Sequence, residues 1–232
     1  MKNILILMLG ATFFQSCIIV KTDKEGTYST YDQSQNGEDY STKPMESHDF
    51  FVTKFSEINA QSGMKFYIKK SNQQKVVVNS NAPCLVVVSS KSGALNIEYD
   101  NKNGSLNNVK TEVTVYTPDF DKLNVSSAGQ ISIEDEFQLD KLNINLNSAG
   151  KVIGNIFANK LAAHLSSAST LEANIQSKIV NLEVSSAAKA NLRGSAEQIK
   201  INASSVAKVN LENLKYKIIE QETNSLAKIY TK

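Results

Sequence analysis

The sequence predicts an all-β protein: a right-handed parallel β-helix, or β-solenoid, with about six coils of 19–21 residues and a β-rich N-terminal part. Two observations lead to this fold class. A short Ser/Ala/Gly phrase returns along the second half of the chain, with its second residue at Ser127, Ser148, Ser167, Ser186, Ser205 and Ser225. Around each copy apolar residues alternate with polar ones, as in a strand with one buried face. Repeats of this length are typical of stacked coils that share one core.

The residues that flank the phrase repeat with it. Six, four and two residues before each second Ser, and four and six after it, the side chain is Ala, Val, Ile or Leu except at Asp121, Gly154, Gln221, Thr223 and Thr231. Each copy should therefore form a strand, a tight corner, a second strand and a connection. Equivalent strands should pair in parallel at ~4.8 Å, and the preference of parallel crossovers predicts right-handed winding. All but one of the exceptions lie in the first or last copy, where a stacked array needs polar ends.

The first residues are predicted to be a targeting signal. Met1-Lys2-Asn3 is followed by an apolar run over residues 4–14, which is shorter than the ~20 residues that span a bilayer. Residues 1–16 therefore have the pattern of a signal peptide. Cys17 follows the run, which resembles a bacterial lipoprotein signal and predicts lipidation of Cys17. The alternative is a secreted protein that is cut nearby. Two or more acyl chains would anchor the protein stably.

The remaining chain divides into a tether and one domain. Residues 17–48 are rich in Ser, Thr, Asp and Gln, so they are predicted to form a lipid-anchored flexible tether. Residues 49–232 are predicted to form a single β-solenoid domain, with a β-rich part over 49–120 and repeat coils over 121–232. A separate small sandwich over the first part is the alternative. Cys84 lies next to an apolar run and is expected to be a buried small hydrophobe outside any disulfide framework.

One outward column of the repeat is basic. The formal net charge is only +2, which argues against a nucleic-acid binder. Three residues after the second Ser, however, four of the six copies carry a lysine, with Gln130 and Thr170 in the other two: Lys151, Lys189, Lys208 and Lys228. Stacked like charges repel, so an anionic glycan or lipid headgroup could lie along this column. The alternative is that these lysines only keep a repetitive sheet soluble.

The sequence predicts no catalytic residues, no metal site and no cofactor. Glu134-Asp135-Glu136 is the densest acidic cluster, but adjacent loop residues cannot converge on one ion. Glu183 and Glu222 share an outward column with His164, and two coils would separate the carboxylates by ~9.6 Å. That distance lies at the upper end for an inverting acid/base pair, and no other residue supports such a site.

The motifs of residues 50–230 resemble a known family. They are Phe55-x-x-Ile58, Ser62-Gly63, a valine run at 76–78, Leu95-x-Ile97, Val113-x-Val115-Tyr116-Thr117-Pro118 and Leu123-x-Val125-Ser126-Ser127-Ala128-Gly129. This order resembles the head GIN domain family of auto-transporter adhesins, which are common as lipoproteins in Bacteroidota. The resemblance implies a right-handed β-helical fold and an adhesive role, and it brings no catalytic or ligand-binding residues.

We therefore expect a non-enzymatic, lipid-anchored protein of the cell envelope, at the outer membrane, that presents a polar β-solenoid surface for adhesion or ligand binding. A glycan or a protein could be its partner, and both the periplasmic and the surface side stay open. The alternatives are a purely structural envelope protein that self-associates through its coil ends and, less favoured, a polysaccharide-active β-helix enzyme.

Overall fold

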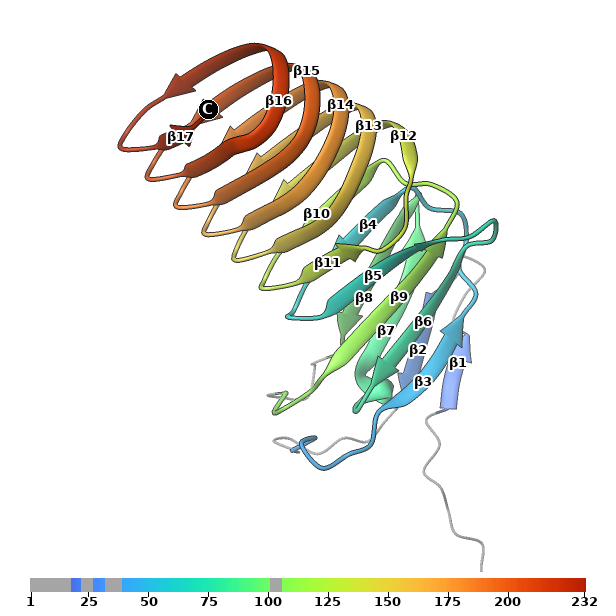
Figure 1. The fold of residues 1–232 in the computed structure, drawn as a ribbon. Coiled ribbons are helices and arrows are strands. Elements are labelled where there is room, and N and C mark those ends of the chain that lie inside the picture. The colour runs from blue at the N-terminus through green and yellow to red at the C-terminus, as the bar shows by residue number, and fades with distance from the viewer. Residues whose placement is uncertain (1–17, 22–26, 32–38, 101–105) are drawn as a thin grey trace, which may run out of the picture.

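The computed structural model describes residues 18–21, 27–31, 39–100 and 106–232. Most of these residues lie in β-strands, and the one described helical element is the short 3-10 helix η1 (Pro83–Leu85). The predicted signal peptide and Cys17 lie outside the described residues. Figure 1 shows the C-terminal half of the chain as a stack of coils and the N-terminal strands at the other end of the stack.

The β-solenoid of about six coils is confirmed. In the central coils one long, bent strand starts after a corner, runs across the first sheet and returns in the second. The coil strands are β10 (Lys122–Val125), β11 (Gln130–Ile133), β12 (Gln138–Leu146), β13 (Lys151–Leu165), β14 (Thr170–Val184), β15 (Lys189–Ala203), β16 (Lys208–Thr223) and β17 (Lys228–Tyr230). All pairings between these strands are parallel, and equivalent residues stand in register, as in Val152, Leu171 and Ala190.

The corners explain the repeated phrase. Both central residues of each corner have left-handed backbone, for example Ser186 (φ 53°) and Ala187 (φ 62°). Two hydrogen bonds stabilise this conformation. The Ala188 amide donates to the Ser185 carbonyl at 3.0 Å within the turn, and the Ala187 amide donates to the Ser205 carbonyl of the next coil at 3.0 Å. Small side chains lower the cost of the left-handed conformation for residues other than glycine.

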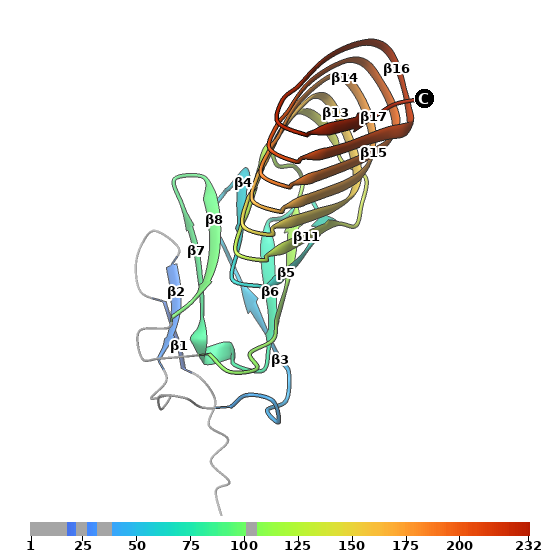
Figure 2. The same ribbon diagram turned by 90° about the vertical axis from the view of Figure 1, so that its left-hand side faces the viewer.

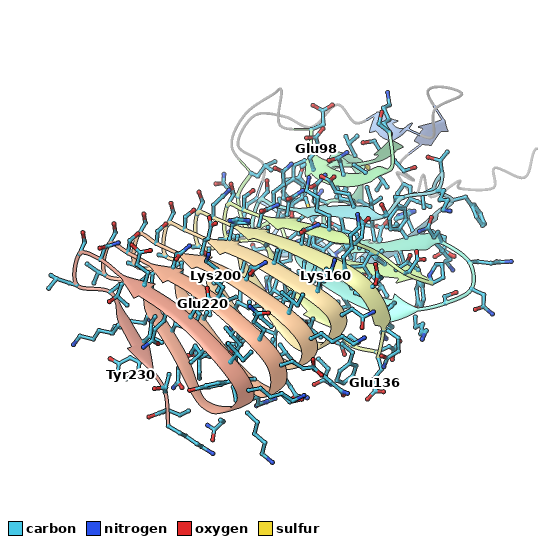
Figure 3. All side chains as sticks on the ribbon, turned by 90° about the horizontal axis from the view of Figure 1, so that it is seen from above. Glu98, Glu136, Lys160, Lys200, Glu220 and Tyr230 are labelled. Atoms are coloured by element: carbon cyan, nitrogen blue, oxygen red, sulfur yellow. The ribbon has the colours of Figure 1, made fainter. Side chains whose placement is uncertain are left out.

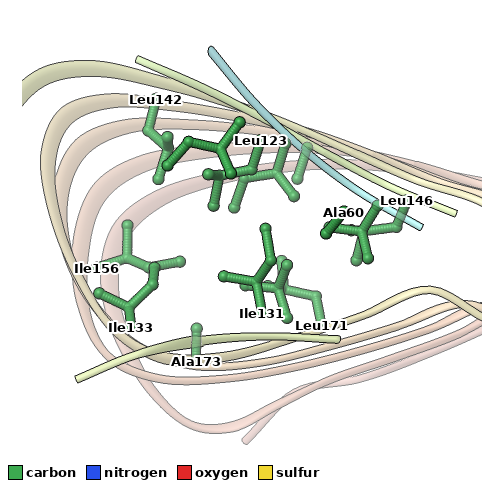
Figure 4. Close-up of a cluster of buried hydrophobic side chains, with 14 of the residues drawn as sticks. Ala60, Leu123, Ile131, Ile133, Leu142, Leu146, Ile156, Leu171 and Ala173 are labelled. Atoms are coloured by element: carbon green, nitrogen blue, oxygen red, sulfur yellow. The ribbon is translucent and has the colours of Figure 1, made fainter. Parts of the chain in front are cut away.

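The core lies between the two sheets. Leu123, Leu142 and Leu146 point inward from one sheet and Ile131 and Leu171 from the other, all nearly inaccessible to solvent (Figure 4). The buried residues form one continuous cluster along the stack. Alternation within each strand thus gives the predicted buried face.

The N-terminal strands continue both sheets of the solenoid. β4 (Glu57–Ala60) pairs in parallel with β10, and β5 (Lys65–Lys70) pairs in parallel with β11. β8 (Ala94–Tyr99) and β9 (Thr111–Thr117) add to them in parallel. Beyond these two strands the pairing is antiparallel: β7 (Val86–Lys91) pairs with β8, β6 (Lys75–Ser80) pairs with β9, and β3 (Glu46–Phe50) pairs with β6. Figure 2 shows the resulting two layers at the base of the stack.

Within the predicted flexible tether over residues 17–48, the described residues 18–21, 27–31 and 39–48 contain strands. β1 (Ile18–Lys21) and β2 (Thr27–Tyr31) pair with each other, and β2 adds to the edge of β7. Tyr40 is buried against Ala82 and Leu85, and β3 begins at Glu46. An open sheet edge and one aromatic anchor can order a polar segment, because backbone hydrogen bonds do not depend on apolar side chains.

Cys84 also differs from expectation. It is half-buried rather than buried, and it is disulfide-bonded. The sequence contains one other cysteine, Cys17, which lies outside the described residues. A Cys17 sulfur that carries a lipid cannot also form a disulfide, so the predicted lipidation of Cys17 requires that Cys84 does not bond to that sulfur.

Candidate functional site

The four predicted lysines form one row, which we call the lysine row: Lys151, Lys189, Lys208 and Lys228. Each is the first residue of its strand, directly after a corner. The register places Thr170 between Lys151 and Lys189, and it places the other lysines on successive coils. Neighbouring positions in this row are therefore ~4.8 Å apart at the backbone.

Charge pairing is uneven along the lysine row. The Lys151 Nζ lies 3.3 Å from Oε1 of Glu172 on the next coil. Lys189, Lys208 and Lys228 have no ion pair within the described part of the chain. Lys189 and Lys208 are exposed. Three adjacent positive charges thus stand side by side in solvent.

The same face carries two further outward rows. We call this face, the outward side of β13–β17 after each corner, the basic face. Its second row contains Glu172, Asn191, Asn210 and Tyr230, and its third contains Asn155, Asn174, Arg193 and Asn213. A hollow of about 480 Å³ opens between these two rows.

The outward side of the second sheet has a different chemistry, seen from above in Figure 3 around Lys160, Lys200 and Glu220. Here Lys122 pairs with Glu57 at 3.2 Å, and Lys141 pairs with Asp121 at 3.4 Å. On this side Lys122 and Lys141 therefore have acidic partners, and Lys200 stands between Asn181 and Glu220 on the neighbouring coils. The described part of this side has no row of three adjacent lysines like that of the basic face.

An asparagine ladder runs along this second sheet. The side-chain amide of Asn59 donates to Asn96 at 2.7 Å, that of Asn124 donates to Asn59 at 2.6 Å, and that of Asn145 donates to Asn124 at 2.8 Å. Stacked amides satisfy one another in parallel in-register sheets. This ladder is not among the features predicted from the sequence, although the sequence carries a signal for it: Asn stands three residues before the second Ser in several copies.

The residues considered for catalysis do not form a composite site. The Nδ1 atom of His164 lies 2.9 Å from Oε2 of Glu183 on the next coil, which continues the ladder as a polar pair. Glu222 lies in the same row as Glu183 but two coils further on, and Asn202 stands between the two carboxylates. Glu183 and Glu222 are both exposed. These side chains therefore form a row on the solvent-exposed surface of the second sheet.

The acidic turn at 134–136 has a structural role. The Asp135 carboxylate accepts a hydrogen bond from the Lys70 amide at 2.8 Å, and the Glu136 carbonyl accepts one from the Lys70 ammonium at 3.2 Å. These bonds fix the turn to the end of β5. No group of three metal-ligating side chains is present in residues 39–100 and 106–232.

A second hollow of about 480 Å³ lies where the strands bend from the first sheet to the second, beside Phe157, Ser177 and Lys217. The Ser177 hydroxyl is buried and donates to the Ala158 carbonyl at 2.6 Å. The Ser177 hydroxyl is thus used in a structural hydrogen bond at the bend.

Within the described ranges, no helix is long and apolar enough to span a bilayer.

Solved structures with a similar fold come from Parabacteroides and Bacteroides species. A protein of Parabacteroides distasonis, described as a putative lipid binding protein, is 13% identical, with a TM-score of 0.72 and coverage of 83% of this chain and 98% of that chain. A putative adhesin of Bacteroides fragilis is 19% identical, with a TM-score of 0.60 and coverage of 83% and 99%. A putative adhesin of Parabacteroides merdae is 10% identical, with a TM-score of 0.56 and coverage of 82% and 97%.

No curated protein matches the chain. The family model described as "Putative auto-transporter adhesin, head GIN domain" matches residues 54–231. This range contains both sheets, the corners and the lysine row. The resemblance read from the sequence motifs is therefore confirmed: the chain belongs to the head GIN domain family of auto-transporter adhesins.

Proposed function

We propose that the protein is a non-enzymatic, lipid-anchored adhesin of the cell envelope that binds an extended anionic glycan along the basic face. The observation that carries this proposal is the run of three adjacent lysines, Lys189, Lys208 and Lys228, which make no ion pair with the residues that the structure describes. The adhesin description of the family supports the adhesive part.

The electrostatics of the lysine row favour an anionic ligand. Like charges on neighbouring strands destabilise a sheet by a few tenths of a kcal/mol per pair, and up to about 1 kcal/mol. A polymer with regularly spaced anionic groups offsets this repulsion and gains from several weak contacts at once. On the second sheet Lys122 and Lys141 already have acidic partners, and Lys200 stands between Asn181 and Glu220, so an anionic polymer would meet no comparable run of lysines there.

The test compares matched double substitutions on the two faces. Lys189→Glu with Lys208→Glu inverts two charges in the lysine row, and Lys160→Glu with Lys200→Glu makes the same change on the second sheet, where both lysines are exposed. Binding to immobilised polygalacturonate should fall at least tenfold for the first pair and stay within twofold for the second. Equal losses for the two pairs, or undiminished binding of the first, would remove the lysine row from the proposal.

Vesicles of phosphatidylglycerol and phosphatidylcholine form a second arm of this experiment, because one structural neighbour is described as lipid binding. The proposal expects binding to the polysaccharide and none to the vesicles. Binding to vesicles alone would replace the glycan by a lipid headgroup.

Catalysis is tested separately with the same polysaccharide. The proposal expects no release of reducing ends or unsaturated products. Turnover that disappears in Glu183→Gln would instead establish an enzyme.

The proposed anchoring and exposure are tested on cells. Protease should cleave the wild-type protein on intact cells, with Cys17→Ala as the control that cannot be lipidated. Protection until the cells are permeabilised would place the protein on the periplasmic side and exclude adhesion to an outside partner.

Self-association is a second candidate function, and the last coil is the observation that favours it. Leu226 is 82% exposed and Ile218 is 56% exposed, and β17 has a pairing partner on only one side among the described strands. Concentration-dependent dimers in analytical ultracentrifugation that are lost in Ile218→Ser with Leu226→Ser would support this function. A monomer at all concentrations would exclude it.

A further inference from the structure

The regular solenoid is interrupted at one place on the basic face. In the pairing of β15 with β16, Asn191 stands opposite Asn210, but Arg193 stands opposite Asn213. Two residues of β16 therefore face one residue of β15, which is a β-bulge. The bulge is held by Asn210, whose side-chain oxygen accepts the Glu212 amide at 2.9 Å and whose amide group donates to the Glu212 carboxylate at 3.2 Å. Bulges often redirect side chains next to functional sites.

Two glycines adjoin the same place. Gly154 (φ 146°) and Gly194 (φ 102°) are the two glycines of the coil strands with left-handed φ. A Cβ on Gly154 would lie 2.7 Å from the Ile133 carbonyl oxygen, and one on Gly194 would overlap the Ile175 carbonyl. Gly154 lines the hollow, and Gly194 follows Arg193. Both positions tolerate no ordinary side chain, so the backbone next to the hollow depends on glycine.

The hollow holds the single arginine of the sequence, Arg193. Its guanidinium makes no hydrogen bond or ion pair within the described part of the chain. The one carboxylate beside it that lines the hollow, Glu172, is engaged by Lys151 at 3.3 Å. A planar guanidinium with parallel N–H groups is the side chain best suited to a carboxylate or sulfate.

Amide groups surround the arginine. Asn155, Asn191, Asn210 and Asn213 line the hollow. Asn174 stands beside Arg193 in the same row and donates to the Asn155 oxygen at 3.2 Å. Side-chain amides donate and accept at once, which suits the hydroxyl groups of a sugar. The volume of about 480 Å³ falls in the range of small-molecule sites.

We propose that this hollow is a subsite for one acidic saccharide unit, with the Arg193 guanidinium bound to its carboxylate or sulfate and the asparagine side chains bound to its hydroxyl groups. The inference rests on the proposed glycan-binding function and makes it specific. The lysine row lies directly beside the hollow, since Lys189 and Lys208 come two residues before Asn191 and Asn210. The row attracts the polymer, and the hollow selects the acidic sugar.

The test measures binding of three hexasaccharides by calorimetry: a galacturonate hexamer, a heparin-derived hexamer and neutral maltohexaose. The wild type should bind an acidic hexamer and not maltohexaose, and the preferred acidic probe tells carboxylate from sulfate. Arg193→Gln should weaken binding roughly tenfold or more, because a charge-assisted pair is lost. Arg193→Lys should recover only part of the affinity, since the charge returns without the paired N–H groups.

Lys200→Gln on the second sheet is the matched control, with the same loss of charge. Its binding should equal that of the wild type. Asn155→Ala should also weaken binding while the far-UV circular dichroism stays unchanged, because Asn155 is exposed.

Three results would overturn the inference. Unchanged binding of Arg193→Gln, together with a loss in Lys189→Glu with Lys208→Glu, would refute the subsite and leave the proposed function standing. An equal loss in Lys200→Gln would reduce the effect to net charge. Absence of binding to both acidic hexamers by the wild type would refute the subsite and the glycan proposal together.

Discussion

Stability should depend on where a core side chain lies along the stack. Leu182 of β14 is 1% exposed, and its register neighbours are Ala163 on the preceding coil and Ile201 on the following coil. Ile229 of β17 is half-buried and has one register neighbour, Val209. Both side chains are truncated to alanine in the comparison.

The expected losses follow from these surroundings. Leu182→Ala removes three buried carbon atoms and leaves a cavity closed by coils on both sides, which costs about 3 kcal/mol of unfolding free energy. Ile229→Ala opens no closed cavity because solvent already reaches the site, so we expect about 1 kcal/mol or less.

The assay is urea unfolding followed by far-UV circular dichroism at 25 °C, since the chain contains no Trp. The midpoint should fall clearly for Leu182→Ala and little for Ile229→Ala, with similar slopes for both. Equal losses at the two positions would refute the idea that each coil is stabilised by its two neighbours.

Three further predictions concern other parts of the chain. Metabolic labelling with palmitate should mark the wild type and Cys84→Ala but not Cys17→Ala; label in all three proteins would refute lipidation of Cys17. Gly150→Ala should lower the thermal midpoint by several degrees, because the new Cβ would lie 2.5 Å from the Val125 carbonyl oxygen at a corner; an unchanged midpoint would show that the corner can move. Burial raises the pKa of Tyr99, partly offset by a hydrogen bond with Thr111. The neutral phenol therefore stabilises the fold below pH ~10, the ordinary tyrosine pKa, and this contribution is lost as the pH rises through the raised value. Titration at 295 nm should show a late component that Tyr99→Phe removes.

The repeat could be predicted because its determinants are local. An inward side chain such as Val152 or Leu171 is apolar in its own strand, and each corner carries its own small residues. Because each repeat has the same pattern, successive coils stack on one another. The left-handed backbone of the corners was harder to foresee, since Val206 and Leu226 occupy it in the last two corners, at φ 65° and 64°.

The hollow beside Arg193 could not be predicted from patterning, because it arises from contacts between coils. Its signal is small: Ser205 and Ser225 are one residue further apart than Ser186 and Ser205, and that extra residue enters the bulge opposite Leu192. Because the repeat length already varies from 19 to 21 residues, one extra residue does not stand out in the sequence. The ordering of residues 18–21 and 27–31 escaped prediction for a related reason, because the edge of β7 supplies their partners.

The direction of hydrogen bonding in the stack determines how the protein responds to tension. The inter-coil bonds run along the long axis of the stack, because the strands lie across it. If the N-terminal side is held and a ligand pulls on the last coils, the load acts along these bonds, and coils detach one by one instead of shearing together. Each released coil of about 19 residues adds roughly 65 Å of chain. The molecule would then lengthen in steps under load. Many copies of the protein could therefore carry the load together before any one of them dissociates from its ligand.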